Sequence, residues 1–453
     1  MELLPVVQSI NMYLSDYILC FLLIGLGLFY SFKTRFVQVR YLGEGFKLFL
    51  SNFSLQGSAQ KGGMSSFQAL ATAVAAQVGT GNVVGVSGAV LTGGPGAIFW
   101  MWIIAFLGMA TNYAEAVLAQ TTRVVKEDGR ILGGPVYYIR RAFPGFFGKC
   151  LALFFAVAII LALGFMGCMV QSNSIGETSA AAFGIPSWSV GLLVALLAGF
   201  VFLGGVNRIA MITEKLVPVM AVFYLLGGTI ILLANLDKLA EAVSLIFYYA
   251  FNPEAIIGGS WGMAIKTAIS QGVKRGLFSN EAGMGSTPHA HALADVKRPH
   301  DQGVVAMIGV FIDTFIVLNM TALVVITTLY TGDGILAHGA VTGISKTNMA
   351  QIAFSSFFGE GIGSVFIAVS LLFFAFSTIL SWNLFAKINV EFLFGKSAVK
   401  IFSLIAIVFV FLGSCLSNDL VWELMDMFNN LMVIPNALAL FALGKLVVGQ
   451  VAE

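Results

Sequence analysis

Long apolar runs follow one another along most of this sequence, and this pattern limits the possible folds more than any other feature. Of the 453 residues, 58% are hydrophobic and only 10% are charged, whereas about a quarter of a soluble chain is charged. A run of about 20 apolar residues can cross the bilayer core as an α-helix. We therefore predict an all-α polytopic membrane protein with about 11 transmembrane helices, at residues 17–32, 67–91, 97–120, 151–172, 190–205, 216–234, 258–285, 304–330, 362–392, 401–416 and 428–448.

The positive charges predict how these spans are oriented. Of the 24 Lys and Arg residues, Lys238, Lys266 and Lys346 fall on one side of the membrane, while Lys274 and Arg275 fall inside a predicted span. The remaining 19 lie in the loops of the other side or in the C-terminal segment. Because short cytoplasmic loops carry an excess of Lys and Arg, we predict an outside N-terminus and a cytoplasmic C-terminus.

The second predicted span contains a break at residues 77–82, which read Gln-Val-Gly-Thr-Gly-Asn. Two glycines separated by one residue weaken a helix in the middle of an otherwise continuous apolar run. Unpaired backbone groups are costly in hydrocarbon, so an unwound segment at this depth needs protein, water or solute around it. The freed amides suit a carboxylate and the freed carbonyls suit a monovalent cation. The break is therefore a candidate binding site, with close helix packing as the alternative.

The seventh predicted span is interrupted as well, because residues 271–283 are too polar and glycine-rich for a lipid-facing helix. The two interrupted spans lie five spans apart in opposite orientations, which is the pattern of inverted repeats that hold a substrate near the midplane. We predict one transmembrane domain over residues 1–453. It consists of an extra first span and cytoplasmic loop at 16–65, a first inverted repeat at 66–234 and a second at 258–449.

Four motifs resemble the signatures of the alanine or glycine:cation symporter family. They stand in the same order at residues 77–82, 93–102, 113–116 and 275–286, and the resemblance extends from about Phe32 to Leu446. It implies a sodium-coupled carrier for alanine or glycine with the fold of the bacterial leucine transporter. In that fold spans 2–11 form a 5+5 inverted repeat with spans 2 and 7 broken, which agrees with the span pattern above.

The resemblance also implies a substrate site, formed by Gly79, Thr80, Gly81, Gln171, Phe278 and Trp382. The first three would meet the carboxylate of the amino acid, and Gln171 would hold its polar groups. The two aromatic side chains would close the pocket, although simple packing is an alternative for Trp382. A small pocket favours alanine and glycine, but one methylene contact discriminates by only about 1–3 kcal/mol.

A sodium site is implied between spans two and nine. Its ligands would be the carbonyl oxygens of Ala75, Val78 and Phe374 and the hydroxyls of Ser377 and Thr378. Five oxygens suit a hard cation such as Na+. The alternative is that the two hydroxyls only bond back to their own helix, as hydroxyls in apolar helices commonly do.

Three acidic residues in or near spans need partners, because an ionised carboxylate at the bilayer centre costs about 2.5–3.5 kcal/mol on insertion scales. Asp313 is the deepest and, with Asn82 in the break, is a candidate second cation or proton site; a structural hydrogen bond is the alternative. Glu115 and Glu281 lie toward cytoplasmic ends of spans. There, pairing with Lys or Arg would form an inner gate, and snorkelling is the alternative.

Two positions depart from the family pattern. Ser381 stands where glycine is expected beside the tryptophan, and Met169 lies near Gln171. Either residue can reshape the pocket, so the preference among small neutral amino acids stays open.

These inferences predict a sodium-coupled symporter that imports alanine or glycine across the bacterial inner membrane by alternating access, without an obligatory protein partner. A proton-coupled carrier of the same fold is the first alternative. A channel is the second, although the polar groups cluster at one depth instead of along a continuous path. A net charge of +2 does not provide the strongly basic surface that nucleic-acid binding needs. The sequence contains no Walker motif that would indicate ATP use.

No nucleophile–base set or metal cluster indicates an enzyme. His289 and His291 have the spacing of a metal pair but no third ligand beside them, so we expect them in a solvated cytoplasmic segment.

Overall fold

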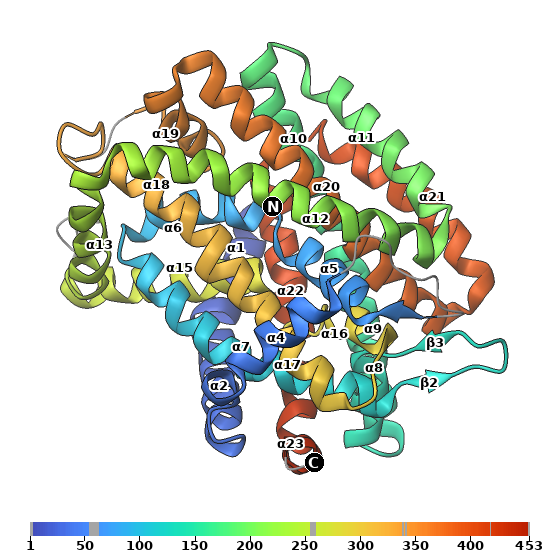
Figure 1. Cartoon of the computed structure of the whole chain (residues 1–453). Helices are drawn as coiled ribbons and strands as arrows, with labels where there is room; N and C mark the ends of the chain where they lie inside the picture. The colour runs from blue at the N-terminus through green and yellow to red at the C-terminus, as the bar shows by residue number, and fades with distance from the viewer. Residues whose placement is uncertain are drawn as a thin grey trace.

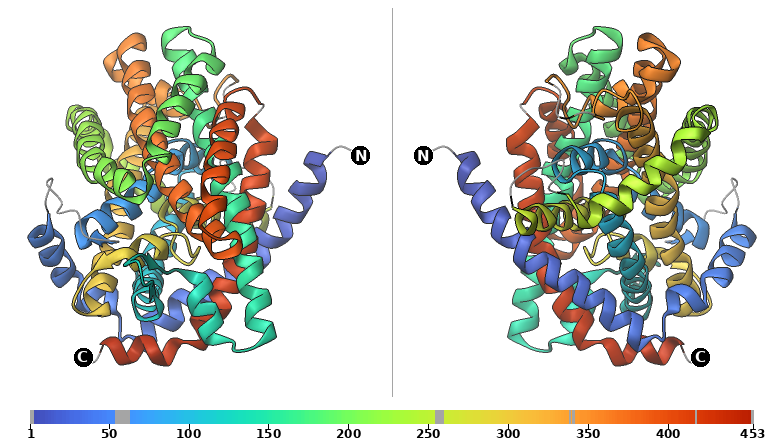
Figure 2. Two further views of the ribbon diagram at one scale, coloured as in Figure 1. Left: turned by 90° about the vertical axis from the view of Figure 1, so that its right-hand side faces the viewer. Right: turned by 90° about the vertical axis from the view of Figure 1, so that its left-hand side faces the viewer.

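Helices make up almost all of the regular structure in the computed structural model, and most run between two opposite ends of the molecule (Figures 1 and 2). The structure describes residues 3–53, 63–253, 260–337, 339, 342–416 and 418–451. Long apolar helices of this kind are expected in a bilayer, because a helix pairs its backbone hydrogen-bonding groups internally.

The first eighteen described elements run from Leu3 to Ala234. They are α1 (Leu3–Tyr13), η1 (Leu14–Leu19), α2 (Cys20–Lys33), α3 (Val37–Arg40), α4 (Leu42–Asn52), β1 (Met64–Ser65), α5 (Ser66–Gln77), η2 (Thr80–Asn82), α6 (Val84–Gly93), α7 (Ala97–Thr122), β2 (Val124–Val125), β3 (Ile131–Leu132), α8 (Pro135–Ala142), α9 (Phe146–Ile159), η3 (Ile160–Gly167), α10 (Cys168–Phe183), α11 (Ser187–Phe202) and α12 (Gly205–Ala234).

The second half has the same character. Its described elements are α13 (Leu236–Phe251), α15 (Trp261–Asn280), α16 (Pro288–Leu293), β4 (Ala294–Asp295), α17 (Pro299–Phe311), η4 (Ile312–Leu318), α18 (Asn319–Leu329), α19 (Met349–Phe358), α20 (Glu360–Phe394), α21 (Lys396–Gly413), α22 (Asn418–Ala442) and α23 (Gly444–Val451). Figure 2 shows α23 along the lower edge of the molecule, where the chain ends.

Eight continuous helical stretches in the described residues are long and apolar enough to cross a membrane, and the bent pair α5–α6 makes a ninth. Two further predicted spans correspond to α11 and α15. The first has only 16 residues, and the second carries Lys266, Lys274 and Arg275. The all-α polytopic fold is therefore confirmed, while the count of eleven stays a prediction.

The break in the second span is confirmed. Helix α5 ends at Gln77, a short 3-10 turn follows, and α6 continues with a bend of 54°. Ser65 starts α5 with a capping box, in which its hydroxyl accepts from the Gln68 amide and the Gln68 side chain accepts from the Ser65 amide.

The interruption of the seventh span lies further along the chain than predicted. Residues 271–280, expected to be unwound, belong to the continuous helix α15. The helix ends only at Glu281, whose φ is +57°, and Gly283 and Gly285 also have positive φ. Polar side chains do not stop α15 because protein, not lipid, surrounds most of this stretch. The predicted start of this span at residue 258 lies outside the described residues.

The helices form two groups that pack extensively within themselves. One contains α5, α6, α7, α15 and α17, and the other contains α10, α11, α20 and α21. The parallel pair β1–β4 joins the chain segment that precedes α5 to the one that follows α16. The two groups meet where α5 packs against α20, and the broken span therefore lies at their interface.

Candidate functional site

The break frees carbonyl groups at the end of α5. The Gly79 amide, which would bond to Ala75 in a continuous helix, donates instead to Asn82 Oδ1 at 3.1 Å. The side chain of Asn82 thus stabilises the turn from within. The carbonyls of Ala75 and Val78 face away from a helical partner and toward α20.

The five groups expected to bind sodium lie together. Thr378 Oγ1 is 2.9 Å from the Ala75 carbonyl oxygen, 3.4 Å from that of Val78 and 3.0 Å from that of Phe374. Ser377 Oγ is 3.4 Å from the Ala75 carbonyl and 2.8 Å from that of Phe374. Both hydroxyls therefore bond back to their own helix, as the alternative held, and at the same time face α5.

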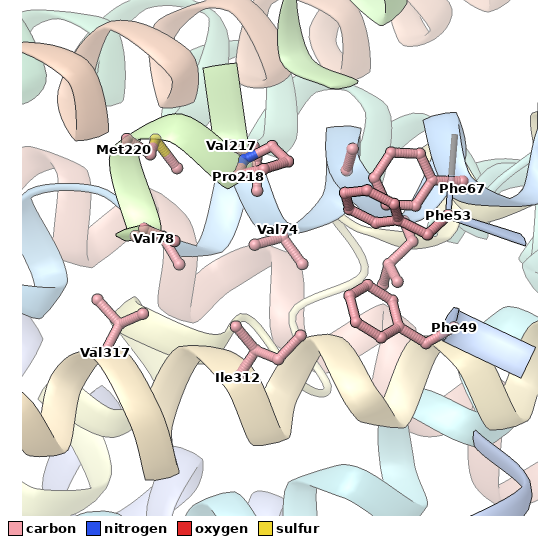
Figure 3. Close-up of a pocket in the computed structure, with 13 residues that line it drawn as sticks. Phe49, Phe53, Phe67, Val74, Val78, Val217, Pro218, Met220, Ile312 and Val317 are labelled. Atoms are coloured by element: carbon pink, nitrogen blue, oxygen red, sulfur yellow. The ribbon is translucent and has the colours of Figure 1, made fainter. Parts of the chain in front are cut away.

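The chemistry of this donor set fits a hard monovalent cation. Three carbonyls and two hydroxyls supply neutral oxygens, and all five residues are buried. The Val78 side chain also lines an apolar cavity of about 110 Å³ with Val74, Met220 and Ile312 (Figure 3). A cavity lined by apolar side chains does not suit an amino acid, so it is not the substrate site.

The residues expected to bind the substrate carboxylate lie beside this cluster. The Thr80 amide donates to Gln171 Oε1 at 3.1 Å. Gln171 therefore occupies the backbone donor that we expect to bind the substrate carboxylate. A Cβ on Gly79 would lie 2.5 Å from Thr378 Oγ1. A Cβ on Gly81 would lie 3.1 Å from both Phe278 Cδ1 and Ser279 Cα. Both glycines are therefore needed for close approach, and the packing alternative is compatible with the binding role.

The two expected aromatic residues also meet at the break. The ring centres of Phe278 and Trp382 are 6.1 Å apart in an edge-to-face arrangement, and those of Phe278 and Trp422 are 5.1 Å apart. Trp382 Nε1 donates to Glu281 Oε1 at 2.5 Å, so this tryptophan does more than pack.

Several buried polar atoms in the break and on the helices α10 and α20 have no hydrogen-bond partner in the described structure. In the break they are Gln77 Oε1 and Thr80 Oγ1; others are Ser172 Oγ and Ser174 Oγ on α10 and Ser381 Oγ on α20. Unpaired buried polar groups cost free energy, and each calls for an explanation such as a bound solute. Ser381, which departs from the family pattern, thus adds a free hydroxyl beside Trp382.

Asp313 lies deep in the molecule in the π-helical segment η4 and is fully buried. Its carboxylate accepts from Asn82 Nδ2 at 2.7 Å, from Ser279 Oγ at 2.9 Å and from Thr314 Oγ1 at 3.0 Å. No Lys or Arg among the described residues pairs with it. Side chains from the break in the second span, from α15 and from η4 therefore meet at one carboxylate that has no cationic partner among the described residues.

The expected pairing of Glu115 and Glu281 with Lys or Arg is wrong within the described residues. Glu115 accepts from the amides of Gly283 and Gly285, both at 2.9 Å, and from Asn436 Nδ2 at 2.7 Å. Glu281 is held by Trp382 and by Ser286 Oγ at 2.5 Å. Both are buried, so snorkelling is wrong too, and Glu115 anchors the unwound backbone after α15.

The histidines are also placed differently from the prediction. His289 and His291 lie fully buried in α16 instead of in a solvated segment. His289 Nε2 lies 2.8 Å from Asn389 Nδ2, and His291 Nδ1 lies 2.8 Å from Gln302 Nε2. The described residues contain no cluster that could hold a metal through His, Cys, Asp or Glu.

Sequence reasoning missed a buried ion-pair cluster beside Trp422. Asp426 Oδ2 lies 2.9 Å from Lys274 Nζ and 3.4 Å from Arg275 Nη1, and the Arg275 guanidinium lies 5.3 Å from the Trp422 ring centre. Two cationic residues inside a predicted span, Lys274 and Arg275, could have indicated a buried acidic partner. Asp426 escaped notice because the predicted span began two residues later.

Comparisons with known proteins identify the family of the chain. The family model for the sodium:alanine symporter family matches residues 1–453. A Methanococcus maripaludis protein named sodium/alanine symporter AgcS is 38% identical over 451 residues, 99% of this chain and 97% of its own. A Bacillus subtilis relative, provisionally named a sodium/proton-dependent alanine carrier, is 40% identical over 451 residues, 97% of this chain and 90% of its own.

Among solved structures, MhsT in complex with L-phenylalanine superimposes with a TM-score of 0.56 at 16% identity, covering 86% of this chain and 89% of that one. At this identity the likeness concerns the fold alone. It agrees with the leucine-transporter-like fold expected from the sequence.

Proposed function

The chain belongs to the sodium:alanine symporter family, and from this we propose that it is a sodium-coupled symporter that imports alanine or glycine. The chain is a multi-pass membrane transporter for an amino acid and a cation, and not an enzyme.

The observation that carries the proposal is the convergence of oxygens between α5 and α20. Thr378 Oγ1 lies within 3.4 Å of the carbonyl oxygens of Ala75, Val78 and Phe374, which belong to two different helix groups. A cation bound there would link the two groups. When bound, sodium supplies positive charge that lowers the cost of burying the substrate carboxylate nearby.

The residues of the break would orient the amino acid. Residues 79–81 lie just before α6, at the positive end of its dipole, which suits a carboxylate. The Gln171 side chain would release its hydrogen bond with the Thr80 amide when the substrate binds. It would then hold the polar groups of the substrate. Phe278 and Trp382 would cover the side chain and exclude water. We propose that rocking of one helix group against the other alternates access to this site.

Proton coupling is the second candidate, and Asp313 favours it. This carboxylate is fully buried, accepts three hydrogen bonds and faces Asn82 in the break. Such a group can bind a second cation or carry a proton. The name of the Bacillus subtilis relative includes both ions.

We further propose that the protein lies in a bacterial inner membrane with its N-terminus outside. The distribution of Lys and Arg between alternate loops supports this orientation. The division into inverted repeats at 66–234 and 258–449 rests on the opposite orientation of the two broken spans.

Uptake by purified protein in liposomes tests the coupling. Labelled alanine and glycine are supplied with an inward sodium gradient, an inward proton gradient, or neither. We expect uptake only with sodium, with leucine as a poor competitor. Uptake that follows the proton gradient and ignores sodium would replace the first candidate by the second, and uptake with neither gradient would indicate a channel.

A further inference from the structure

A cavity of about 620 Å³ lies at the basic end of the molecule, away from the broken spans. Its walls are two helical hairpin turns, α11–α12 and α20–α21, and the β2–β3 hairpin, all at the right-hand edge of Figure 1. The residues that line it include Arg130, Lys387, Glu391, Lys396 and Lys400. Because spanning helices turn near the membrane surface, we infer that this cavity lies at the depth of the lipid headgroups.

The charges in the cavity do not balance. Glu391 pairs with Arg130, which also pairs with Asp128. Lys387, Lys396 and Lys400 have no ion pair with a carboxylate among the described residues. Four cations and two carboxylates leave a net charge of +2 around the cavity, which suits an anion.

Lys387 makes the strongest case for a bound anion. Its side chain is on α20, and the residue is only 7% exposed. Its Nζ donates to the Phe202 carbonyl oxygen at 2.7 Å and lies 5.1 Å from the Phe202 ring centre. An ammonium group has three N–H donors, and a buried charge without a counter-ion is costly. The remaining donors line a cavity that an anionic group can enter.

The surface beside the cavity is apolar. Leu203 at the α11–α12 turn is 56% exposed, Phe394 at the α20–α21 turn is 70% exposed, and Ile401 on α21 is 62% exposed. A free phosphate ion would leave this apolar surface uncovered, whereas the acyl chains of a lipid would cover it. The combination favours a molecule with an anionic head and apolar chains.

We propose that this cavity binds the phosphate headgroup of an anionic phospholipid, with Lys387, Lys396 and Lys400 as its cationic ligands. The acyl chains lie along the exposed apolar side chains of α11 and α21. A lipid there would tie α11 and α12 to α20 and α21, and so would stabilise the helix group that carries Thr378. This inference does not depend on which amino acid or ion is transported.

The test measures thermal unfolding of the purified full chain in mild detergent as phosphatidylglycerol is added, with phosphatidylcholine of the same acyl chains and inorganic phosphate as separate arms. The variant is Lys396→Gln with Lys400→Gln. The matched control is Lys149→Gln with Lys445→Gln, which removes two exposed lysines elsewhere. Each cation near a membrane surface contributes about fivefold in affinity, so the variant should need about 25-fold more phosphatidylglycerol for half of the stabilisation.

We expect the control to respond as the wild type does, and phosphatidylcholine to give no shift. An equal loss of the response to phosphatidylglycerol in both double variants would mean that the lipid responds to general surface charge. That result would overturn the proposed site. Stabilisation by inorganic phosphate equal to that by phosphatidylglycerol would overturn the lipid assignment. Lys387→Gln should lose the response as well; if it does not fold, the exposed pair still decides the outcome.

Discussion

The hydroxyl oxygen of Thr378 lies 2.9 Å from the carbonyl oxygen of Ala75, although the two residues are 303 positions apart in the chain. One belongs to α20 and the other to the end of α5, so this contact crosses the interface between the two helix groups. Any change in their relative position must break or remake it, which makes it a natural place to couple an ion to motion.

Thr378→Val removes the hydroxyl and keeps the shape of the side chain. If this oxygen binds sodium, the sodium concentration for half-maximal alanine uptake should rise at least about tenfold, because a buried hydrogen-bonding group is lost from the ligand set. Thr378→Ser should restore much of the affinity. Thr328→Val is the control, since Thr328 only bonds back to Val324; unchanged sodium dependence in Thr378→Val would remove the residue from the site.

Gly79→Ala should abolish uptake while the protein still folds into the membrane. The added Cβ would lie 2.5 Å from Thr378 Oγ1 and 3.2 Å from Gln171 Oε1, so it would push both groups out of place. Gly85→Ala in α6 is the matched control, because the nearest atom to its Cβ is the Thr80 carbonyl oxygen at 3.9 Å. We expect the control to retain uptake within about twofold, as an ordinary van der Waals contact allows; equal loss in both variants would contradict a local role for Gly79.

Asp313→Asn removes the charge at the break and keeps most of the volume. A second cation site predicts that sodium dependence becomes less steep and that less charge moves per alanine, measured as current in a supported membrane. A proton site predicts instead that uptake loses its dependence on pH. If both measurements match the wild type and only thermal stability falls, Asp313 has the structural role.

Asp426→Asn should destabilise the protein by about 3–5 kcal/mol, because removing one partner of a buried ion pair leaves the other charge uncompensated. Asp426 is 4% exposed and holds both Lys274 and Arg275. The comparison is Asp419→Asn, whose exposed pair with Lys346 at 3.6 Å should be worth less than about 1 kcal/mol. Unfolding with increasing denaturing detergent measures both, and similar losses would show that the Asp426 cluster is not energetically buried.

The sequence predicted the first break better than the second. At residues 77–82 the signal is local, since two glycines and an Asn cap lie within one apolar run and the structure ends α5 there. In the seventh span the polar residues 271–280 suggested unwinding, yet they remain helical. Their polarity reports the protein surroundings of the helix, while the chain actually turns at Glu281 and at two glycines of positive φ.

The sequence by itself determined the membrane-spanning helical fold, the position of the first break and the residues from which a cation and substrate site can be assembled. These features depend on the composition and backbone preferences of contiguous residues. Only the tertiary structure decided that Glu115 holds the amides of Gly283 and Gly285, that Asp313 has no cationic partner among the described residues, and that Asp426 does. A buried charge takes its partner from whichever helix packs beside it, and that neighbour is set by the packing of spans far apart in the chain.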